Sequence, residues 1–177
     1  MSDDALRYPI GRIDLGRAVT PTDLAAAVAG IAGLPARVRE AVRGLDDALL
    51  DTPYRPDGWS PRQIVHHLAD SHMNAFTRLK LALTEDSPVI KPYLQEPWAR
   101  LADSRLPVAG SLGILDGLHE RWAALLGGFG PAEWARTFRH PELGSTMRLD
   151  TQTALYDWHG RHHTAHITSL RRRKGWK

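Results

Sequence analysis

The sequence of 177 residues contains no cysteine. This absence excludes disulfide bonds, thiolate metal ligands and a cysteine nucleophile from the protein's own chemistry. Any metal ion that the chain holds must therefore bind to nitrogen and oxygen atoms. The chain also lacks an apolar run near the roughly 18 residues that a membrane span requires, and residues 1–8 are acidic and polar where a signal peptide is basic and then apolar. We therefore expect a cytoplasmic protein that makes no contact with a membrane.

The chain has little excess of charge of either sign, with 23 Lys and Arg against 20 Asp and Glu. Four of the basic residues, Arg171 to Lys174, form one run in the predicted last turn of a helix, where the negative end of the helix dipole favours cations. No predicted helix combines a basic face with residues that read a nucleic-acid groove. We therefore expect a small-molecule substrate and no nucleic-acid partner.

The length and composition predict one globular domain over residues 1–177. Hydrophobic residues make up 42% of the chain and charged residues 24%, which is typical of a globular protein, and 177 residues suffice for one core of ordinary size. Residues 1–19 are predicted to form an extended N-terminal arm, because Pro9 and Gly11 interrupt regular structure there.

Helix caps and apolar spacing predict four main helices. The first begins at Thr20-Pro21, and Gly33 and Pro35 predict a break or a kink in it before it ends near Val42. The second begins at the capping box of residues 60–63 and continues to about residue 84. The third spans 111–126, where apolar residues recur every three or four positions. The fourth is capped by residue 150 or 151 and ends before residue 175.

The connections between these helices differ in character. Residues 87–110 are rich in proline, with one helical turn expected at 97–100, and form a candidate lid. Residues 137–149 favour a small hairpin around a turn at 140–144. The fold class predicted from these elements is all-α, a four-helix bundle with a long Pro-rich connection and a small hairpin before the last helix.

The last predicted helix carries four histidines within eight residues: His159, His162, His163 and His166. Residues four apart lie on one face of a helix, so His159 pairs with His163, and His162 pairs with His166. The two pairs are rotated by roughly 100° from each other, so both cannot face the same interior. His159 and His163 continue the apolar stripe that begins at Leu155, which favours this pair as the ligands of one ion.

The second predicted helix offers a third ligand from His66, His67 and His72. His67 lies on the side that also carries Ile64 and Leu68, whereas His66 is predicted to turn toward solvent or a partner. We therefore predict one divalent ion per subunit bound by His67, His159 and His163. Three neutral imidazoles leave coordination positions open, which suits a catalytic site. Zinc and nickel both accept nitrogen ligands and iron is a third candidate, so the ligand type alone does not name the ion; we expect zinc, with nickel as the alternative.

Asp70 and several aromatic residues are further candidates for the site. Asp70 follows His67 by about one turn and could either move protons or hold a histidine ring in place. The aromatic side chains could line a substrate mouth, although aromatics at helical spacing belong more often to a core. These residues are Trp98, Trp122, Trp158, Tyr93 and Tyr156.

The chain resembles the DinB-like superfamily, and within it the YfiT group of metal-dependent hydrolases or bacillithiol transferases. The resemblance covers nearly the whole chain and is carried by the stretches 8–11, 51–55, 65–74 and 158–168, together with Trp59. It places the family's metal ligands on His67, His159 and His163. It also implies an up-down-down-up four-helix bundle, a cytoplasmic homodimer, and a zinc or nickel ion with open coordination. The helix after Gly110 and the hairpin near His140 match the family less distinctively.

Three functions are compatible with these residues. The first is a metal-dependent hydrolase, in which the ion activates water for attack on an electrophilic carbon. The alternative is a thiol S-transferase, in which the ion holds a low-molecular-weight thiol of the bacillithiol type as a thiolate. A further alternative is a non-enzymatic metal-binding protein that uses His162 and His166 as additional ligands.

Overall fold

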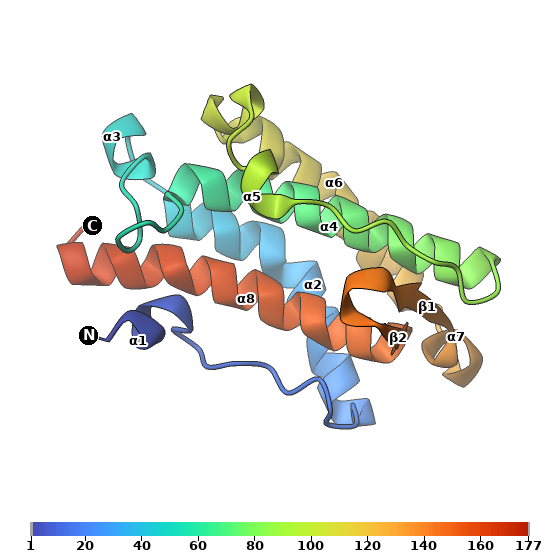
Figure 1. Ribbon diagram of the computed structural model, residues 1–177. Helices are drawn as coiled ribbons and strands as arrows, with labels where there is room; N and C mark the ends of the chain where they lie inside the picture. The colour runs from blue at the N-terminus through green and yellow to red at the C-terminus, as the bar shows by residue number, and fades with distance from the viewer. Residues whose placement is uncertain (1, 177) are drawn as a thin grey trace.

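The computed structural model describes residues 2–176 and contains four long helices, as the sequence predicts. They are α2 (Pro21–Val42), α4 (Pro61–Thr84), α6 (Ala109–Leu126) and α8 (Leu149–Lys174). α2 packs against α6 and α8, and α4 also packs against α6 and α8. Successive helices therefore lie diagonally across the bundle in two pairs, α2 with α4 and α6 with α8, and only α4 and α6 are both successive and adjacent. α2 and α8 run in one direction and α4 and α6 in the other (Figure 1).

Short elements connect the four long helices. They are α1 (Asp3–Arg7), α3 (Asp47–Leu50), α5 (Gln95–Trp98), the 3-10 turn η1 (Ala102–Arg105), α7 (Pro131–Ala135), and the hairpin of β1 (Thr137–His140) and β2 (Ser145–Arg148) around the 3-10 turn η2 (Pro141–Leu143). The hairpin is antiparallel, and Gly144 takes the left-handed conformation, with φ of 59°, that its tight turn requires. The prediction of a bundle with a small hairpin before the last helix is confirmed.

The caps explain where the long helices begin and end. The capping boxes at Thr20 and Ser60 are both formed. A proline follows each cap at the first helical position, where the helix makes no use of a backbone N–H. α8 ends at Gly175, which has φ of 68°. The cap predicted for α8 at residue 150 or 151 is wrong. The N-cap is Arg148, and the Asp150 carboxylate lies inside the first turn, where it accepts hydrogen bonds from Arg148 and Thr151.

Two local predictions near the N-terminus need correction. Residues 3–7 of the arm, predicted as extended, form α1, which is capped by the Ser2 side chain. Of the break or kink predicted at Gly33 and Pro35, the break is wrong, because α2 runs without interruption from Pro21 to Val42 with Pro35 inside it. Burial of this face of α2 in the core outweighs the local cost of the proline, and a side chain from α6 replaces the missing hydrogen bond, as described below.

The core consists of two apolar clusters with a layer of histidines between them. One cluster includes Leu34, Leu68, Leu115 and Ile167, and the other includes Ile31, Ala75, Trp122 and Tyr156. α4, α6 and α8 each contribute to both clusters, and each places a histidine between its two contributions: His72, His119 and His159. The bundle therefore encloses a polar layer near its middle.

α2 and α8 approach each other closely at this level. A Cβ atom on Gly160 would lie 2.8 Å from both methyl carbons of Leu34, so only glycine fits without a shift of the core. Since Gly160 stands between His159 and His163, this contact also fixes the height of both histidines against α2.

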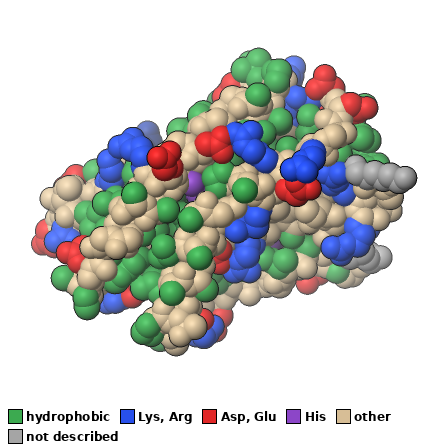
Figure 2. Space-filling view, turned by 180° about the vertical axis from the view of Figure 1, so that it is seen from behind, with side chains coloured by type: hydrophobic (Ala, Val, Ile, Leu, Met, Phe, Trp, Pro, Cys, Tyr) green, Lys and Arg blue, Asp and Glu red, His purple; other side chains and the backbone are tan. Residues whose placement is uncertain are grey.

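The outer surface is mixed in charge. On the face opposite to that of Figure 1, Lys and Arg lie beside Asp and Glu, and little histidine surface is visible (Figure 2). Arg171 caps the C-terminal end of α2 by donating to the carbonyls of Ala41 and Arg43, which gives part of the basic run a structural role. Across residues 2–176, none of the helices combines the length and apolarity that crossing a bilayer requires.

Candidate metal centre

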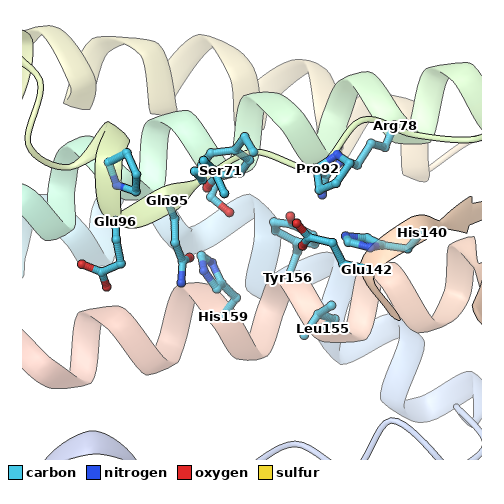
Figure 3. Close-up of a pocket in the computed structure, with 13 residues that line it drawn as sticks. Ser71, Arg78, Pro92, Gln95, Glu96, His140, Glu142, Leu155, Tyr156 and His159 are labelled. Carbon is cyan, nitrogen blue, oxygen red and sulfur yellow. The ribbon is translucent and has the colours of Figure 1, made fainter. Parts of the chain in front are cut away.

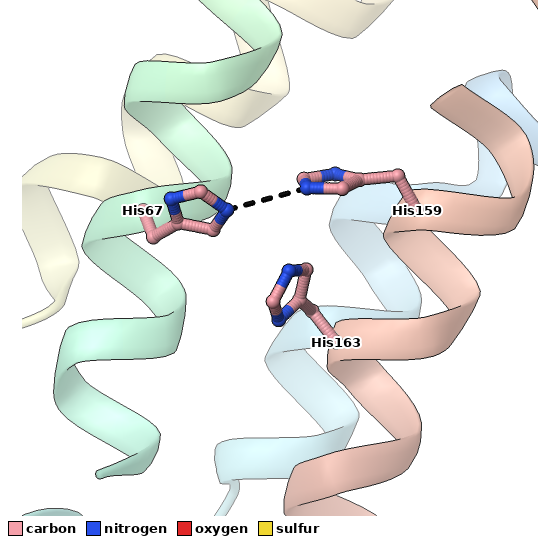
Figure 4. Close-up of side chains that lie close together, drawn as sticks. All are labelled: His67, His159 and His163. Atoms are coloured by element: carbon pink, nitrogen blue, oxygen red, sulfur yellow. Dashed lines mark hydrogen bonds between the residues drawn. The ribbon is translucent and has the colours of Figure 1, made fainter. Parts of the chain in front are cut away.

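The structure brings together the three histidines that the sequence singles out. His67 comes from α4, and His159 and His163 come from successive turns of α8 (Figure 4). One ring nitrogen from each residue lies within 4.8 Å of those of the other two. Nε2 of His67 is 3.2 Å from Nε2 of His159. Among residues 2–176, no other group of three or more potential metal-ligating side chains converges as closely.

The arrangement of the three rings fits one small divalent ion. Two nitrogens bound to a tetrahedral zinc at 2.0–2.1 Å lie about 3.3 Å apart, close to the separation of the two Nε2 atoms. The planes of the three rings cross at angles between 58° and 72°, so the rings meet edge to face rather than in a stack. Three imidazole donors without a fourth protein ligand leave room for a water molecule or a substrate atom.

Burial keeps these imidazoles in the form that binds metals. It lowers the pKa of His67 to about 4, and it lowers the pKa of both His159 and His163 well below the ordinary value of 6.5. Neighbouring histidines lower the pKa of His159 and His163 further. The rings are therefore neutral at neutral pH, and their lone pairs are available without the loss of a proton.

Trp59 closes one side of the histidine group. Its ring centroid lies 4.5 Å from that of His67 and 5.9 Å from that of His163, nearly parallel to the latter. Its indole Nε1 donates a hydrogen bond of 3.2 Å to Oε2 of Glu96 in α5. The tryptophan thus shields two rings from water and holds a carboxylate from the long Pro-rich connection near the site.

Two cavities meet at His159. One has a volume of about 490 Å³ and the other of about 300 Å³, and both are lined by Gln95, Glu96 and His159. The larger cavity extends toward the hairpin, past Tyr156 to Arg78 and His140 (Figure 3). The smaller one extends toward the N-terminal arm and includes His163 among its walls. The segment that was predicted as a lid therefore places α5 over the junction of the two cavities.

Three further histidines of the two clusters, His66, His162 and His166, contact residues outside the convergent group. His66 was predicted to face solvent or a partner, but it is buried against η1 and α6, and its nitrogens lie 2.8 Å from Ser111 Oγ and 3.0 Å from the Leu106 carbonyl oxygen. His166 lies 2.9 Å from the carbonyl oxygen of Arg7 and stacks on Tyr54. His162 and His166 thus contact the N-terminal arm at Tyr8 and Arg7, while their ring centroids lie 5.1 and 5.3 Å from that of His163.

Asp70 stands apart from the cavities. It is half-buried, and both burial and the nearby Asp103 raise the pKa of its carboxyl. It does not occur among the described residues that line either cavity at His159. Glu96, which lines both, is the carboxylate that the sequence did not single out. No local pattern marks it, because it lies in a segment without periodicity.

The aromatic candidates divide between the core, the two cavities and the surface, where Trp98 is exposed and its ring centroid lies 4.6 Å from that of Tyr93. Trp122 is fully buried in the core. Tyr93 and Tyr156 line the larger cavity, and Trp158 lines the smaller one. Burial raises the pKa of Tyr93 to about 12 and also raises that of Tyr156, so both phenols stay protonated even in alkaline solution.

Comparison with known proteins places the chain in a family. The model of the DinB superfamily matches residues 31–167, which is most of the chain. This chain belongs to the DinB superfamily. A protein of Bacillus mycoides (strain KBAB4), named "Putative metal-dependent hydrolase", is 52% identical over 171 residues, covering 97% of this chain and 98% of the relative. A protein of Bacillus cereus (strain B4264) with the same description matches to the same extent.

A solved structure has the same architecture. YfiT from Bacillus subtilis, described as a probable metal-dependent hydrolase with an unusual four-helix bundle topology, aligns with a TM-score of 0.94 at 43% identity. The alignment covers 98% of this chain and 99% of that one. The resemblance inferred from the sequence motifs is thereby confirmed, as is the bundle topology that it implied.

Proposed function

We propose that this DinB superfamily protein is a metal-dependent hydrolase that holds one divalent ion, zinc in the first place, between His67, His159 and His163. The observation that carries the proposal is the convergence of one buried and two partly buried neutral imidazoles beside two cavities that meet at His159. The names of its relatives in Bacillus support the same activity. When bound there, a divalent ion supplies a Lewis acid with open positions, which acidifies a water molecule or a thiol.

The chain's own residues have separable roles in such a reaction. The histidines hold the ion, and Trp59 keeps bulk water away from two of them. We assign the proton acceptor for the nucleophile to the Glu96 carboxylate, because it lines both cavities and accepts a hydrogen bond from the Trp59 indole. Tyr93 and Tyr156 donate hydrogen bonds to a substrate in the larger cavity. Asp70 lies outside both cavities, and we give it no part in the proton transfer.

A test of hydrolysis uses zinc-loaded protein and p-nitrophenyl acetate as the probe. We expect zinc-dependent release of p-nitrophenolate that disappears in His163→Ala. The matched control is His162→Ala, which removes the neighbouring imidazole outside the convergent group and should leave the rate within about twofold. Equal rates for zinc-loaded and metal-free protein would refute an assignment of the activity to this centre.

A second candidate function, thiol S-transfer, is favoured by the presence of two cavities. Hydrolysis needs space for one organic substrate, whereas joining a thiol to an electrophile needs space for two, and the cavities of about 490 and 300 Å³ share one wall at His159. In this reaction the sulfur–carbon bond forms as the carbon–halogen bond of an alkyl halide breaks, the halide leaves, and the thiol proton passes to Glu96. Mass spectrometry after incubation of zinc-loaded protein with bacillithiol and an alkyl halide separates the two candidates, because only the transferase yields a metal-dependent conjugate.

A further inference from the structure

Pro35 leaves one backbone carbonyl of α2 without its helical partner. In an α-helix the N–H of each residue donates to the carbonyl four residues earlier, so residue 35 would serve the carbonyl of Ile31. Proline has no N–H, and Ile31 is fully buried, so neither the helix nor solvent can supply the donor. An unpaired buried carbonyl is costly, and something else in the core must satisfy it.

His119 of α6 supplies the missing donor. Its Nδ1 lies 2.7 Å from the carbonyl oxygen of Ile31. A carbonyl oxygen only accepts hydrogen bonds, so the proton of this ring must be on Nδ1. Burial lowers the pKa of His119 to about 4, so the ring is neutral and its Nε2 carries a lone pair. The proline therefore fixes the tautomer of a histidine on another helix.

The direction of the hydrogen bonds then propagates through two more rings. Nε2 of His119 lies 3.1 Å from Nδ1 of His72, so His72 donates from Nδ1 and accepts at Nε2. Nε2 of His72 lies 3.2 Å from Nδ1 of His159, so His159 in turn donates from Nδ1. The lone pair of His159 is left on Nε2, the atom that lies 3.2 Å from Nε2 of His67.

We propose that Pro35, His119 and His72 form a positioning relay that sets the tautomer and ring orientation of His159 for metal binding. This inference rests on the proposed metal centre and deepens it. A metal-binding imidazole ordinarily donates its second N–H to a carboxylate, a carbonyl or water. Here the imidazoles of His72 and His119 lie between the Nδ1–H of His159 and the carbonyl of Ile31. The chain of hydrogen bonds therefore crosses from α8 through α4 and α6 to α2.

The first test is the tautomeric state of the parent chain without metal. In protein labelled with ¹⁵N-histidine, long-range ¹H–¹⁵N NMR spectra at pH 7.5 distinguish a proton on Nδ1 from one on Nε2. We expect His119, His72 and His159 all to carry the proton on Nδ1. A proton on Nε2 of His159 or of His119 would overturn the relay. This measurement needs no variant and no bound ion.

The second test is zinc affinity measured by competition with a chromophoric chelator. His72→Phe keeps an aromatic ring but removes both hydrogen bonds, and should weaken zinc binding by about 10–100-fold. His72→Gln retains one acceptor and one donor and should restore part of that loss. A role in packing alone would make phenylalanine the better substitute, so parental affinity in His72→Phe would overturn the proposal.

Pro35→Ala probes the far end of the relay, where no side chain touches the metal centre. It restores an N–H that competes with His119 for the Ile31 carbonyl, and we expect a mixture of tautomers at His119 and weaker zinc binding. Pro21→Ala is the matched control, because Pro21 stands at the first position of the same helix, where no partner requires its N–H. If the parent chain binds zinc and Pro35→Ala behaves like Pro21→Ala, the relay is refuted while the metal centre stands. If the parent chain binds no zinc, both are refuted.

Discussion

Acid should destabilise the metal-free protein well before its carboxylates are protonated. Lowering the pH from 8 to 5 is the perturbation, and the groups that respond are the buried histidines. Because their pKa values are lowered in the folded state, the unfolded chain binds more protons between pH 6.5 and about 4, and stability falls as the pH decreases through that window. Above pH 6.5 both states are neutral at these groups and the effect vanishes.

The magnitude follows from the pKa values of His67 and His119, each lowered from 6.5 to about 4 by burial. At pH 5 such a shift reduces the free energy of unfolding by about 2 kcal/mol per residue relative to pH 8. Three further histidines, His72, His159 and His163, shift in the same direction. Domains of this size are stable by about 5–15 kcal/mol, so the two residues alone account for a large fraction.

The assay is urea denaturation of the metal-free protein, followed by circular dichroism at pH 8 and pH 5. We expect the urea midpoint to fall steeply at pH 5. His119→Phe serves as a comparison, because removal of one titrating ring should make the pH dependence shallower even if the variant is less stable at pH 8. Identical midpoints at the two pH values would refute the conclusion that these rings are buried and neutral.

Two further predictions concern the cavity and the bundle. Glu96→Gln should lower the rate of p-nitrophenyl acetate hydrolysis by the zinc-loaded protein by about 10²-fold or more, because the variant lacks the proton acceptor. Zinc affinity should stay within about twofold, because Glu96 does not bind the ion, and equal losses of rate and affinity would contradict this role. Gly160→Ala should be less stable than Gly113→Ala by about 1–3 kcal/mol in urea denaturation. The added Cβ at residue 160 would lie 2.8 Å from Leu34, whereas the space around a Cβ at residue 113 is open. Equal stability of the two variants would show that α2 and α8 can separate there at little cost.

The parts of the fold that follow local rules could be predicted from the sequence. The capping box at Ser60 and the left-handed Gly175 depend on neighbours within four residues, and both are found in the structure. The convergence of His159 and His163 follows from their spacing on one helical face, and His67 shares the apolar side of its own helix.

What the sequence could not reveal depends on contacts between distant residues. Pro35 locally predicts a break or a kink, and His119, 88 positions from Ile31, supplies the donor that the continuous helix needs. His119 itself is a single histidine in an otherwise ordinary helix, without a spacing that marks it. His66 was misplaced because its partners are Ser111 and a carbonyl in the Pro-rich connection, whose path has no periodicity to read.

The most direct test of the metal centre is the zinc content and affinity of purified protein beside three single variants. Elemental analysis and chelator competition should find one tightly held zinc per chain in the parent protein and in His162→Ala. Both His67→Ala and His163→Ala should lose the ion or bind it at least about 100-fold more weakly. Retention of zinc at parental affinity by either of these two variants would contradict a centre built from the convergent histidines.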